Sequence, residues 1–228
     1  MFDYFILAYH LAREAIAEGK LSEFFGHQVF RNRIVIPVEM DLRGPLADPR
    51  IPSELDIRFV EFQPEDIQAG KWMFPVSSRR VKASRNLKRG LRGFALVQNG
   101  KVVGDLWCVC RKKNEEPVSH PDFKLLDIHC KEQEVYAFDM LIDPSYRGKN
   151  LAAPLQRSLQ HALKDEGFVK VYGGYYEDNL PALWMHRMLK FKEYPKRRVS
   201  RFFSYLKSTL LNVNNTPASF AKTTKQGE

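Results

Sequence analysis

The sequence predicts a mixed α/β fold in which helices flank a central mixed sheet. Three observations indicate it. Residues 135–142 are almost wholly apolar, as in a central strand that is buried on both faces. Two strand-like runs earlier in the chain are joined by Asn99-Gly100, which is a strong signal for a β-hairpin. Beyond residue 142, helical and strand-like segments alternate, which requires at least one crossover connection.

Residues 1–53 are expected to form an N-terminal extension made of a helix, a strand and a loop. Apolar side chains recur at helical spacing over residues 1–25, so a helix is expected there. Residues 33–40 are rich in β-branched side chains and predict a strand, although Pro37 favours an edge strand or a bulge. Residues 41–53 hold three prolines and a glycine, which is typical of a loop.

Residues 54–211 are expected to form the main domain. Its first half predicts, in chain order, a strand at 55–62, a short helix that opens at 63–66, a helix at 71–90, and hairpin strands at 94–97 and 101–110. Residues 113–132 are polar and interrupted, and we interpret them as an insertion loop.

The second half of the main domain begins with the apolar strand at 135–142. It continues with a turn at 144–150, a helix at 151–166 that ends at Gly167, a strand at 169–176, a helix that starts at Asp178 or Asn179 and runs to about Leu189, and a last strand at 199–206. Residues 212–228 are polar and are expected to be a disordered tail.

The charge of the chain is concentrated in two segments. Lys and Arg number 36 against 27 Asp and Glu, a formal net charge of +9. Residues 79–92 hold seven cations and no anion, and residues 190–207 hold seven cations against Glu193. Such segments indicate an anionic partner: a phosphate-bearing cofactor, an acidic carrier protein, a membrane surface or nucleic acid. A solvated surface face is the alternative for either segment.

Composition argues against several classes of protein. No apolar run approaches the roughly 18 to 20 residues of a membrane-spanning helix, and Met1-Phe2-Asp3-Tyr4 lacks the build of a secretion signal. Three cysteines cannot form a disulfide framework, and no second cysteine pair or Cys/His cluster predicts a zinc site, so no metal is expected. We therefore expect a protein of the reducing cytoplasm.

The segment most informative about chemistry leaves the apolar strand and enters a helix, at residues 143–152. A loop at a helix start presents unpaired backbone N–H groups at the positive end of the helix dipole, and such a site binds a diphosphate. Gly148 allows close approach of the backbone, and Asn150 is among the few non-glycine residues that accept a left-handed conformation. Arg147 and Lys149 add positive charge. An ordinary strand-to-helix turn with solvated cations is the alternative.

The run Arg147-Gly148-Lys149-Asn150-Leu151-Ala152 resembles the acyl-CoA loop of the GCN5-related N-acetyltransferases. That loop reads Arg or Gln, two residues, Gly, one residue, and Gly or Ala, so Asn150 stands in place of its central glycine. A second similarity lies downstream, where Asn179, Ala182 and Phe191 agree with a family pattern. In that pattern Lys190 replaces a glycine and His186 replaces a tyrosine. The resemblance covers about residues 55–206.

This resemblance implies that the central strand splays from its neighbour and that the pantetheine of an acyl-CoA lies in the gap. It implies direct attack of an amine on the thioester, with an oxyanion donor among the backbone N–H groups near Leu141 or Ile142. The implied cofactor-binding residues are Leu141, Ile142, Arg147, Gly148, Lys149, Asn150, Leu151, Ala152 and Asn179.

Three side chains are candidates for proton transfer. His186 replaces the tyrosine that protonates the departing thiolate in many members, and histidine titrates near neutral pH; a helix histidine that only packs is the alternative. Tyr136 falls where some relatives place a catalytic glutamate, but a phenol is a poor base. Asp139 becomes a candidate base if it is buried, and a structural carboxylate is its alternative. The two alternate along the strand, so only one should face the ligand. A chain of waters as the base also stays open.

The expected function is transfer of an acyl group, in the first place acetyl, from acetyl-CoA or another acyl-CoA to the amine of a small acceptor. The basic helix at 79–92 falls where the family builds its acceptor side, which suits an anionic acceptor. One alternative is a long-chain N-acyl synthase that uses acyl carrier protein or acyl-CoA. A second is a non-catalytic module that binds an anionic membrane or nucleic acid, although no zinc finger or RNA-binding aromatic motif is present.

Overall fold

The structure is a computed structural model that describes residues 2–19, 30–111, 119–202 and 205–211. Its helices are α1 (Phe2–Ala17), α3 (Pro64–Gln68), α4 (Ser77–Lys88), α5 (Pro121–Leu126), α6 (Ala152–Asp165) and α7 (Leu180–Met188), with short 3-10 helices η1 (Ser53–Leu55) and η2 (Pro144–Tyr146). Its strands are β1 (Phe30–Asp41), β2 (Arg58–Glu61), β3 (Arg92–Gln98), β4 (Lys101–Arg111), β5 (Glu134–Ile142), β6 (Lys170–Tyr176), β7 (Lys192–Glu193), β8 (Arg197–Phe202) and β9 (Tyr205–Leu210).

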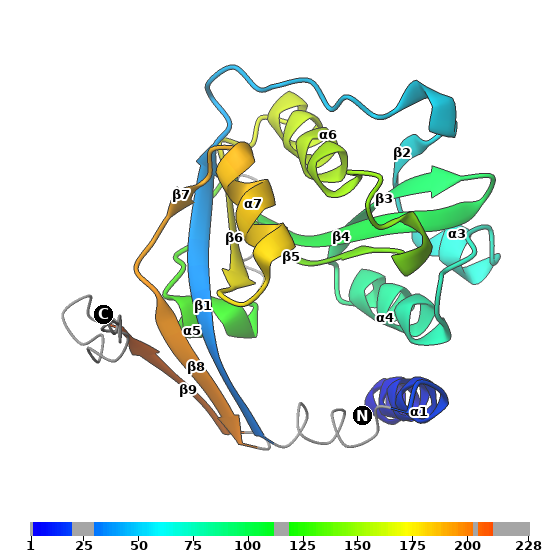
Figure 1. Cartoon of the computed structure of the whole chain (residues 1–228), viewed down its shortest axis with the longest axis horizontal. Coiled ribbons are helices and arrows are strands. Elements are labelled where there is room, and N and C mark those ends of the chain that lie inside the picture. Colours follow the sequence, from blue (N-terminus) through cyan, green and yellow to red (C-terminus); the bar gives the residue numbers. More distant parts are fainter. Residues whose placement is uncertain (1, 20–29, 112–118, 203–204, 212–228) are drawn as a thin grey trace, which may run out of the picture.

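All the described strands belong to one sheet, in the order β2-β3-β4-β5-β6-β1-β8-β9, with β7 paired to β1. Neighbouring strands are antiparallel except β5 and β6, which are parallel and are connected through α6. Figure 1 shows this arrangement as a twisted sheet that helices flank. The mixed α/β fold that the sequence predicts is therefore confirmed, with β5 as the central strand.

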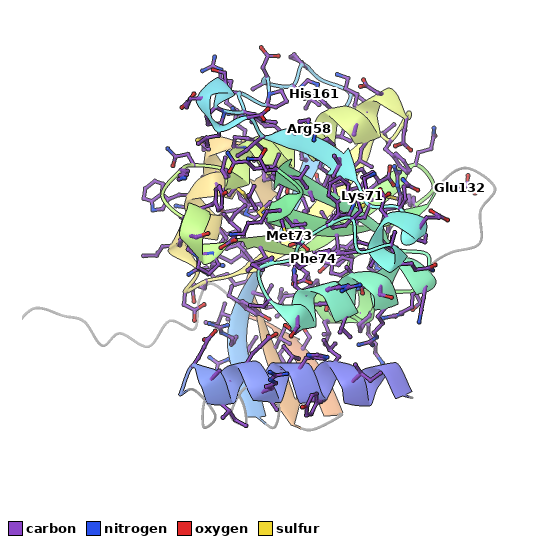
Figure 2. All side chains as sticks on the ribbon, turned by 90° about the vertical axis from the view of Figure 1, so that its right-hand side faces the viewer. Arg58, Lys71, Met73, Phe74, Glu132 and His161 are labelled. Carbon is purple, nitrogen blue, oxygen red and sulfur yellow. The ribbon has the colours of Figure 1, made fainter. Side chains whose placement is uncertain are left out.

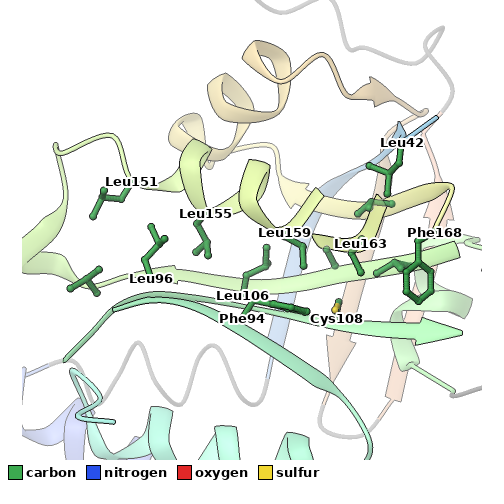
Figure 3. Close-up of a cluster of buried hydrophobic side chains, with 14 of the residues drawn as sticks. Leu42, Phe94, Leu96, Leu106, Cys108, Leu151, Leu155, Leu159, Leu163 and Phe168 are labelled. Atoms are coloured by element: carbon green, nitrogen blue, oxygen red, sulfur yellow. The ribbon is translucent and has the colours of Figure 1, made fainter. Parts of the chain in front are cut away.

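The hydrophobic core lies on both faces of the sheet. On one face, the leucines that recur along α6 pack on β3 and β4, and Figure 3 shows Leu155, Leu159 and Leu163 above this surface. Each of these leucines is fully buried, and burying one such side chain contributes about 1.5–3 kcal/mol. On the other face, Trp107 lies in a second cluster under α3, α4 and α5. Together the two layers fix β4 and β5 at the centre of the molecule.

Helix α4 is anchored by the N-terminal helix α1, which Figure 2 shows alongside it. Val76 stands at the N-cap of α4 and offers no side-chain cap. The carboxylate of Glu14 takes that role, because it accepts hydrogen bonds from Ser77 Oγ (3.1 Å) and from the backbone N–H of Ser78 (2.8 Å). A carboxylate at a helix N-terminus is favourable for the helix dipole. Helix α1 therefore holds the start of α4 in place.

The strand β1, from the segment expected as an extension, lies inside the sheet between β6 and β8. The edge strand that is one of the two expectations for Pro37 is therefore wrong, whereas the bulge agrees with the register, because the partner advances by one residue more than β1 between Val35–Arg197 and Val38–Glu193. On its second side, β1 pairs with β8 as far as Val35 and with β7 from Val38, so Pro37 stands between the two partners. Its carbonyl accepts a hydrogen bond from Tyr194 N (2.8 Å) on that side, where no ladder bond needs the missing N–H.

Two other expectations differ from the structure. The segment 113–132 was expected to be a loop throughout, but it contains α5, and only its residues from 119 onward are described. The single last strand expected at 199–206 is instead a pair of antiparallel strands, β8 and β9. The disordered tail expected at 212–228 lies outside the described residues.

Candidate active site

The candidate site is a cleft at the point where β5 and β6 separate. The two strands pair in parallel only from Glu134–Lys170 to Tyr136–Tyr172, and beyond this pair they diverge. The separation follows from a bulge in β5, where the register with β4 shifts between Asp105 and Trp107. Asp139 lies in this bulge with a left-handed φ of 56°. The cleft encloses about 1600 Å³, and the splayed arrangement that the resemblance implies is present.

A buried arginine holds the bulge. Arg79 of α4 donates from Nη1 to Asp139 Oδ2 (2.8 Å) and from Nη2 to the Asp139 carbonyl (2.6 Å). The same guanidinium binds Asp105 on β4, with Nε and Nη2 both donating to Oδ1 at 2.9 and 2.8 Å. Arg79 thus ties α4 to both strands at the place where β5 turns away from β6.

The expected basic segment 79–92 is only partly a free surface. Arg79 is buried in the ion pairs just described, and Arg92 binds Glu61 and Glu166, each at 2.6 Å. The partners of these two arginines lie far away in the sequence, so spacing along the chain does not reveal them. Arg79 and Arg92 of this segment therefore stabilise the fold, and at most its other cations are available to a charged ligand.

The loop after β5 has the geometry that favours an anion. Gly148 has φ 81° and Asn150 has φ 54°, so the left-handed conformation expected for Asn150 is confirmed. Helix α6 follows, with Leu151 at its N-cap and no side-chain cap. Within the described part of the chain, no hydrogen bond uses the backbone N–H of Gly148 or those of residues 150–153. Unpaired amides at a helix start are the groups that bind a diphosphate.

The predicted cofactor-binding residues lie together. Eight of the nine line the cleft: Leu141, Ile142, Arg147, Gly148, Asn150, Leu151, Ala152 and Asn179. Lys149 instead places its ammonium over the ring of Tyr146, 4.6 Å from the ring centre. Asn179 caps α7 by accepting a hydrogen bond from Ala182 N (3.2 Å), as its place at a helix start predicts.

The two strand candidates for the base are both held by hydrogen bonds. Tyr136 donates its hydroxyl to Asp122 Oδ2 (2.6 Å), and burial together with this carboxylate raises the pKa of Tyr136 well above 10. Burial raises the pKa of Asp139, but the charges of Arg79 and Lys82 outweigh it and the pKa of Asp139 lies below its usual value. At neutral pH, Tyr136 is therefore protonated and Asp139 is an ion-paired carboxylate.

His186 lies at the cleft wall between two aromatic rings. Its ring stacks on Tyr175 with centroids 5.0 Å apart, and Phe191 meets it edge-on at 4.9 Å. Its Nδ1 donates to the Ala182 carbonyl (2.7 Å), which turns Nε2 into the site that gains or loses a proton. Burial lowers the pKa of His186 below 6.5, so the neutral ring predominates at pH 7.

The buried ring of His186 predicts a pH dependence of stability. Since its folded pKa lies below 6.5, the unfolded chain binds the proton more readily, and the free energy of unfolding falls as the pH drops through this range. His186→Phe keeps an aromatic ring between its neighbours. In this variant the free energy of unfolding is expected to fall less as the pH drops. Urea unfolding at about pH 7.5 and about pH 5.5 measures it, and equal falls in both proteins would contradict the prediction.

Sequence reasoning missed Asp122, which lines the cleft from α5. The available signal was the order His120-Pro121-Asp122, because proline at the first helical position and an acid beside it favour a helix start. In the folded chain, Asp122 accepts a hydrogen bond from Tyr136 of β5. The local sequence does not predict this pairing.

The described part of the chain contains no group of three or more His, Cys, Asp or Glu side chains that could hold a metal ion. None of its helices is both long enough and apolar enough to cross a membrane.

Comparison with known structures finds similar folds at low sequence identity. A GCN5-related N-acetyltransferase from Sphaerobacter thermophilus is 14% identical with a TM-score of 0.50, over 86% of this chain and 58% of that one. The glucosamine N-acetyltransferase region of a fungal multi-domain GH3 β-N-acetylglucosaminidase is 16% identical with a TM-score of 0.54, over 82% and 23%. A tandem GNAT protein from the clavulanic acid biosynthesis pathway is 18% identical with a TM-score of 0.51, over 78% and 56%.

The chain thus spans less than two thirds of the length of each of these structures. No curated protein matches the sequence. The sequence model of the acetyltransferase (GNAT) family matches residues 59–191, which contain the bulge, the loop and the helices α5, α6 and α7 of the cleft. This match covers more than half of the chain, and the protein therefore belongs to the acetyltransferase (GNAT) family, a family of acyltransferase enzymes.

Proposed function

We propose that the protein transfers an acyl group, in the first place acetyl, from an acyl-CoA to the amine of a small acceptor. The observation that carries the proposal is the row of unpaired amides at Gly148 and residues 150–153, at the mouth of the cleft between β5 and β6. The family match and the similar folds support it. The acyl-CoA supplies an activated thioester carbonyl, and the residues of this chain bind, orient and move protons around it.

The binding roles follow from the loop. The amides at the start of α6 donate hydrogen bonds to the pyrophosphate oxygens, and Arg147 at the cleft wall adds a cation. The glycine and the asparagine in left-handed conformations turn these amides toward one another without a large side chain between them. The backbone N–H groups near Leu141 and Ile142, beyond the bulge, are the proposed donors to the oxyanion.

We further propose that the acceptor is anionic. The cleft is lined by five Arg and Lys side chains, Arg33, Arg50, Lys82, Arg147 and Arg157, against two carboxylates, Asp122 and Asp139. This excess of positive charge favours an acceptor that carries a negative group besides its amine.

His186 is the group that we propose to protonate the departing thiolate. Its Nε2 is the free ring nitrogen, and the ring lines the cleft. Because its pKa is lowered, only a minority of the rings carry the proton at pH 7, and a kcat that depends on it falls as the pH rises. The His186→Phe variant is then expected to lower kcat and to leave the Kd of acetyl-CoA unchanged.

A thermal-shift series with acetyl-CoA, palmitoyl-CoA and free CoA tests the proposed function. A ligand at about 100 times its Kd stabilises the folded protein by about 2.7 kcal/mol, so acetyl-CoA and CoA are expected to raise Tm. A larger shift with palmitoyl-CoA would favour the long-chain synthase. No shift with any of the three would contradict acyl-CoA binding and favour a non-catalytic module.

A further inference from the structure

The reaction proposed above needs a group that removes a proton from the acceptor amine. Asp122 and Asp139 are the two carboxylates among the described residues that line the cleft. Asp139 is engaged by two cations, since its Oδ2 lies 2.8 Å from Arg79 Nη1 and 2.5 Å from Lys82 Nζ. A carboxylate held in this way binds a further ammonium ion weakly, because its charge is already neutralised.

Asp122 has different surroundings. Its side chain is 35% exposed, and among the described residues it pairs with the imidazole of His120, with Nδ1 3.6 Å from Oδ2. Burial lowers the pKa of His120, so this ring is neutral at pH 7 and leaves the charge of Asp122 uncompensated. Oδ2 accepts the Tyr136 hydroxyl, while Oδ1 has no hydrogen-bond partner within the described ranges.

The place of this carboxylate in the cleft suits the reaction. Tyr136, which holds Asp122, forms the last pair of β5 with β6 before the strands diverge. Asp122 therefore lines the cleft beside the point where the strands diverge, and the loop after β5 lines the same cleft.

Aromatic rings flank the same spot. The centroid of the His120 ring lies 4.5 Å from that of Phe138 and 5.2 Å from that of Tyr136. Phe138 and Tyr136 both line the cleft. The face of an aromatic ring attracts a cation, so these rings and the carboxylate together form a site for an ammonium group.

We propose that Asp122 binds the acceptor as a primary ammonium ion and serves as the general base of the reaction, with Tyr136 as the residue that positions it. The inference rests on the proposed acyl transfer. Asp122 takes one proton from R–NH3⁺. The free amine then attacks the thioester carbon, the C–N bond forms and the C–S bond breaks. The second proton passes from nitrogen to the leaving thiolate by way of His186 Nε2, which gives up one proton to sulfur and takes one from nitrogen, and Asp122 returns its proton to water.

The test compares Asp122→Asn with Asp127→Asn, a matched change at the other end of α5, where the side chain is exposed. The probe is 4-(aminomethyl)benzoate, whose ring fits an aromatic wall, whose ammonium fits a carboxylate and whose own carboxylate suits the cationic lining, with CoA release from acetyl-CoA as the signal. Asp122→Asn is expected to lower kcat/KM for this amine by about 100-fold or more, within the usual range for a general base. The Kd of acetyl-CoA should not change, and Asp127→Asn should behave as the wild type.

A second variant keeps the proposal testable if Asp122→Asn disturbs α5. Tyr136→Phe removes the hydroxyl and leaves the carboxylate, so it is expected to lower kcat/KM by no more than about tenfold. Equal turnover by Asp122→Asn and Asp127→Asn would overturn the inference, as would a wild type that binds acetyl-CoA but does not acetylate 4-(aminomethyl)benzoate. A wild type that does not bind acetyl-CoA would instead overturn the proposed function.

Discussion

Replacing Gly148 by glutamate is expected to raise the Kd of acetyl-CoA by about 100-fold, or about 2.7 kcal/mol. The variant puts a negative charge among amides that we propose to bind the pyrophosphate. Two unit charges about 5 Å apart repel by about 3 kcal/mol at an effective dielectric constant near 20, and this repulsion accounts for the effect. Isothermal titration calorimetry with acetyl-CoA measures it.

Gly90→Glu is the matched control for this variant. Gly90 also has a left-handed φ, 74°, is exposed, and has open space where a Cβ would stand, as Gly148 has. Both variants therefore carry the same charge and a similar backbone strain of about 1–2 kcal/mol. Gly90 lies between α4 and β3, away from the cleft lining, so its variant should bind acetyl-CoA as the wild type does. Equal affinity of the two variants would contradict a pyrophosphate site at Gly148.

Replacing Arg79 by methionine is expected to lower the free energy of unfolding by about 3–5 kcal/mol. Asp105 is 1% exposed, and the change removes the guanidinium that binds it at 2.8 Å. Burial raises the pKa of Asp105 even in the presence of Arg79, and without the arginine this pKa is expected to rise further. The bulge at Asp139 also loses the donor to its carbonyl. Urea unfolding gives the change directly.

Three further proteins define the origin of this loss: Arg80→Met, Asp105→Asn and the double variant Arg79→Met/Asp105→Asn. Arg80 is the exposed neighbour of Arg79 on α4, and Arg80→Met should change the free energy of unfolding by no more than about 0.5 kcal/mol. Combining Arg79→Met with Asp105→Asn removes the stranded carboxylate and is expected to restore part of the stability. If the double variant lost more free energy of unfolding than Arg79→Met and Asp105→Asn lose together, the result would contradict a paired buried charge.

The parts of the fold that the sequence predicts well are those that depend on near neighbours. Asn99 and Gly100 both have positive φ, 48° and 76°, as the hairpin requires. Asn179 caps its helix through a residue three positions on, and Asn150 adopts the left-handed turn because its short amide side chain tolerates it. In each case the physical requirement is met within a few residues, so the local pattern carries the information.

The parts that it does not predict depend on distant partners. The interior place of β1 is decided by β6, which lies about 135 residues further along the chain, and Pro37 fits only because β7 and β8 leave a gap beside it. From the sequence, Arg79 is expected to be a surface cation on a basic helix. In the folded chain, Asp105 and Asp139 lie beside its guanidinium and bind it. Eight of the nine predicted cofactor residues lie between positions 141 and 152, which explains why the loop could be recognised while Asp122 could not.

The start of α6 and the loop before it are proposed to bind the diphosphate of an acyl-CoA. A crystal structure of the protein with coenzyme A would show whether these contacts form. We expect the pyrophosphate oxygens within about 3 Å of the backbone nitrogens at Gly148 and residues 150–153, with the pantetheine between β5 and β6. Coenzyme A bound elsewhere, or a cleft that stays free of it at saturating concentration, would contradict the claim.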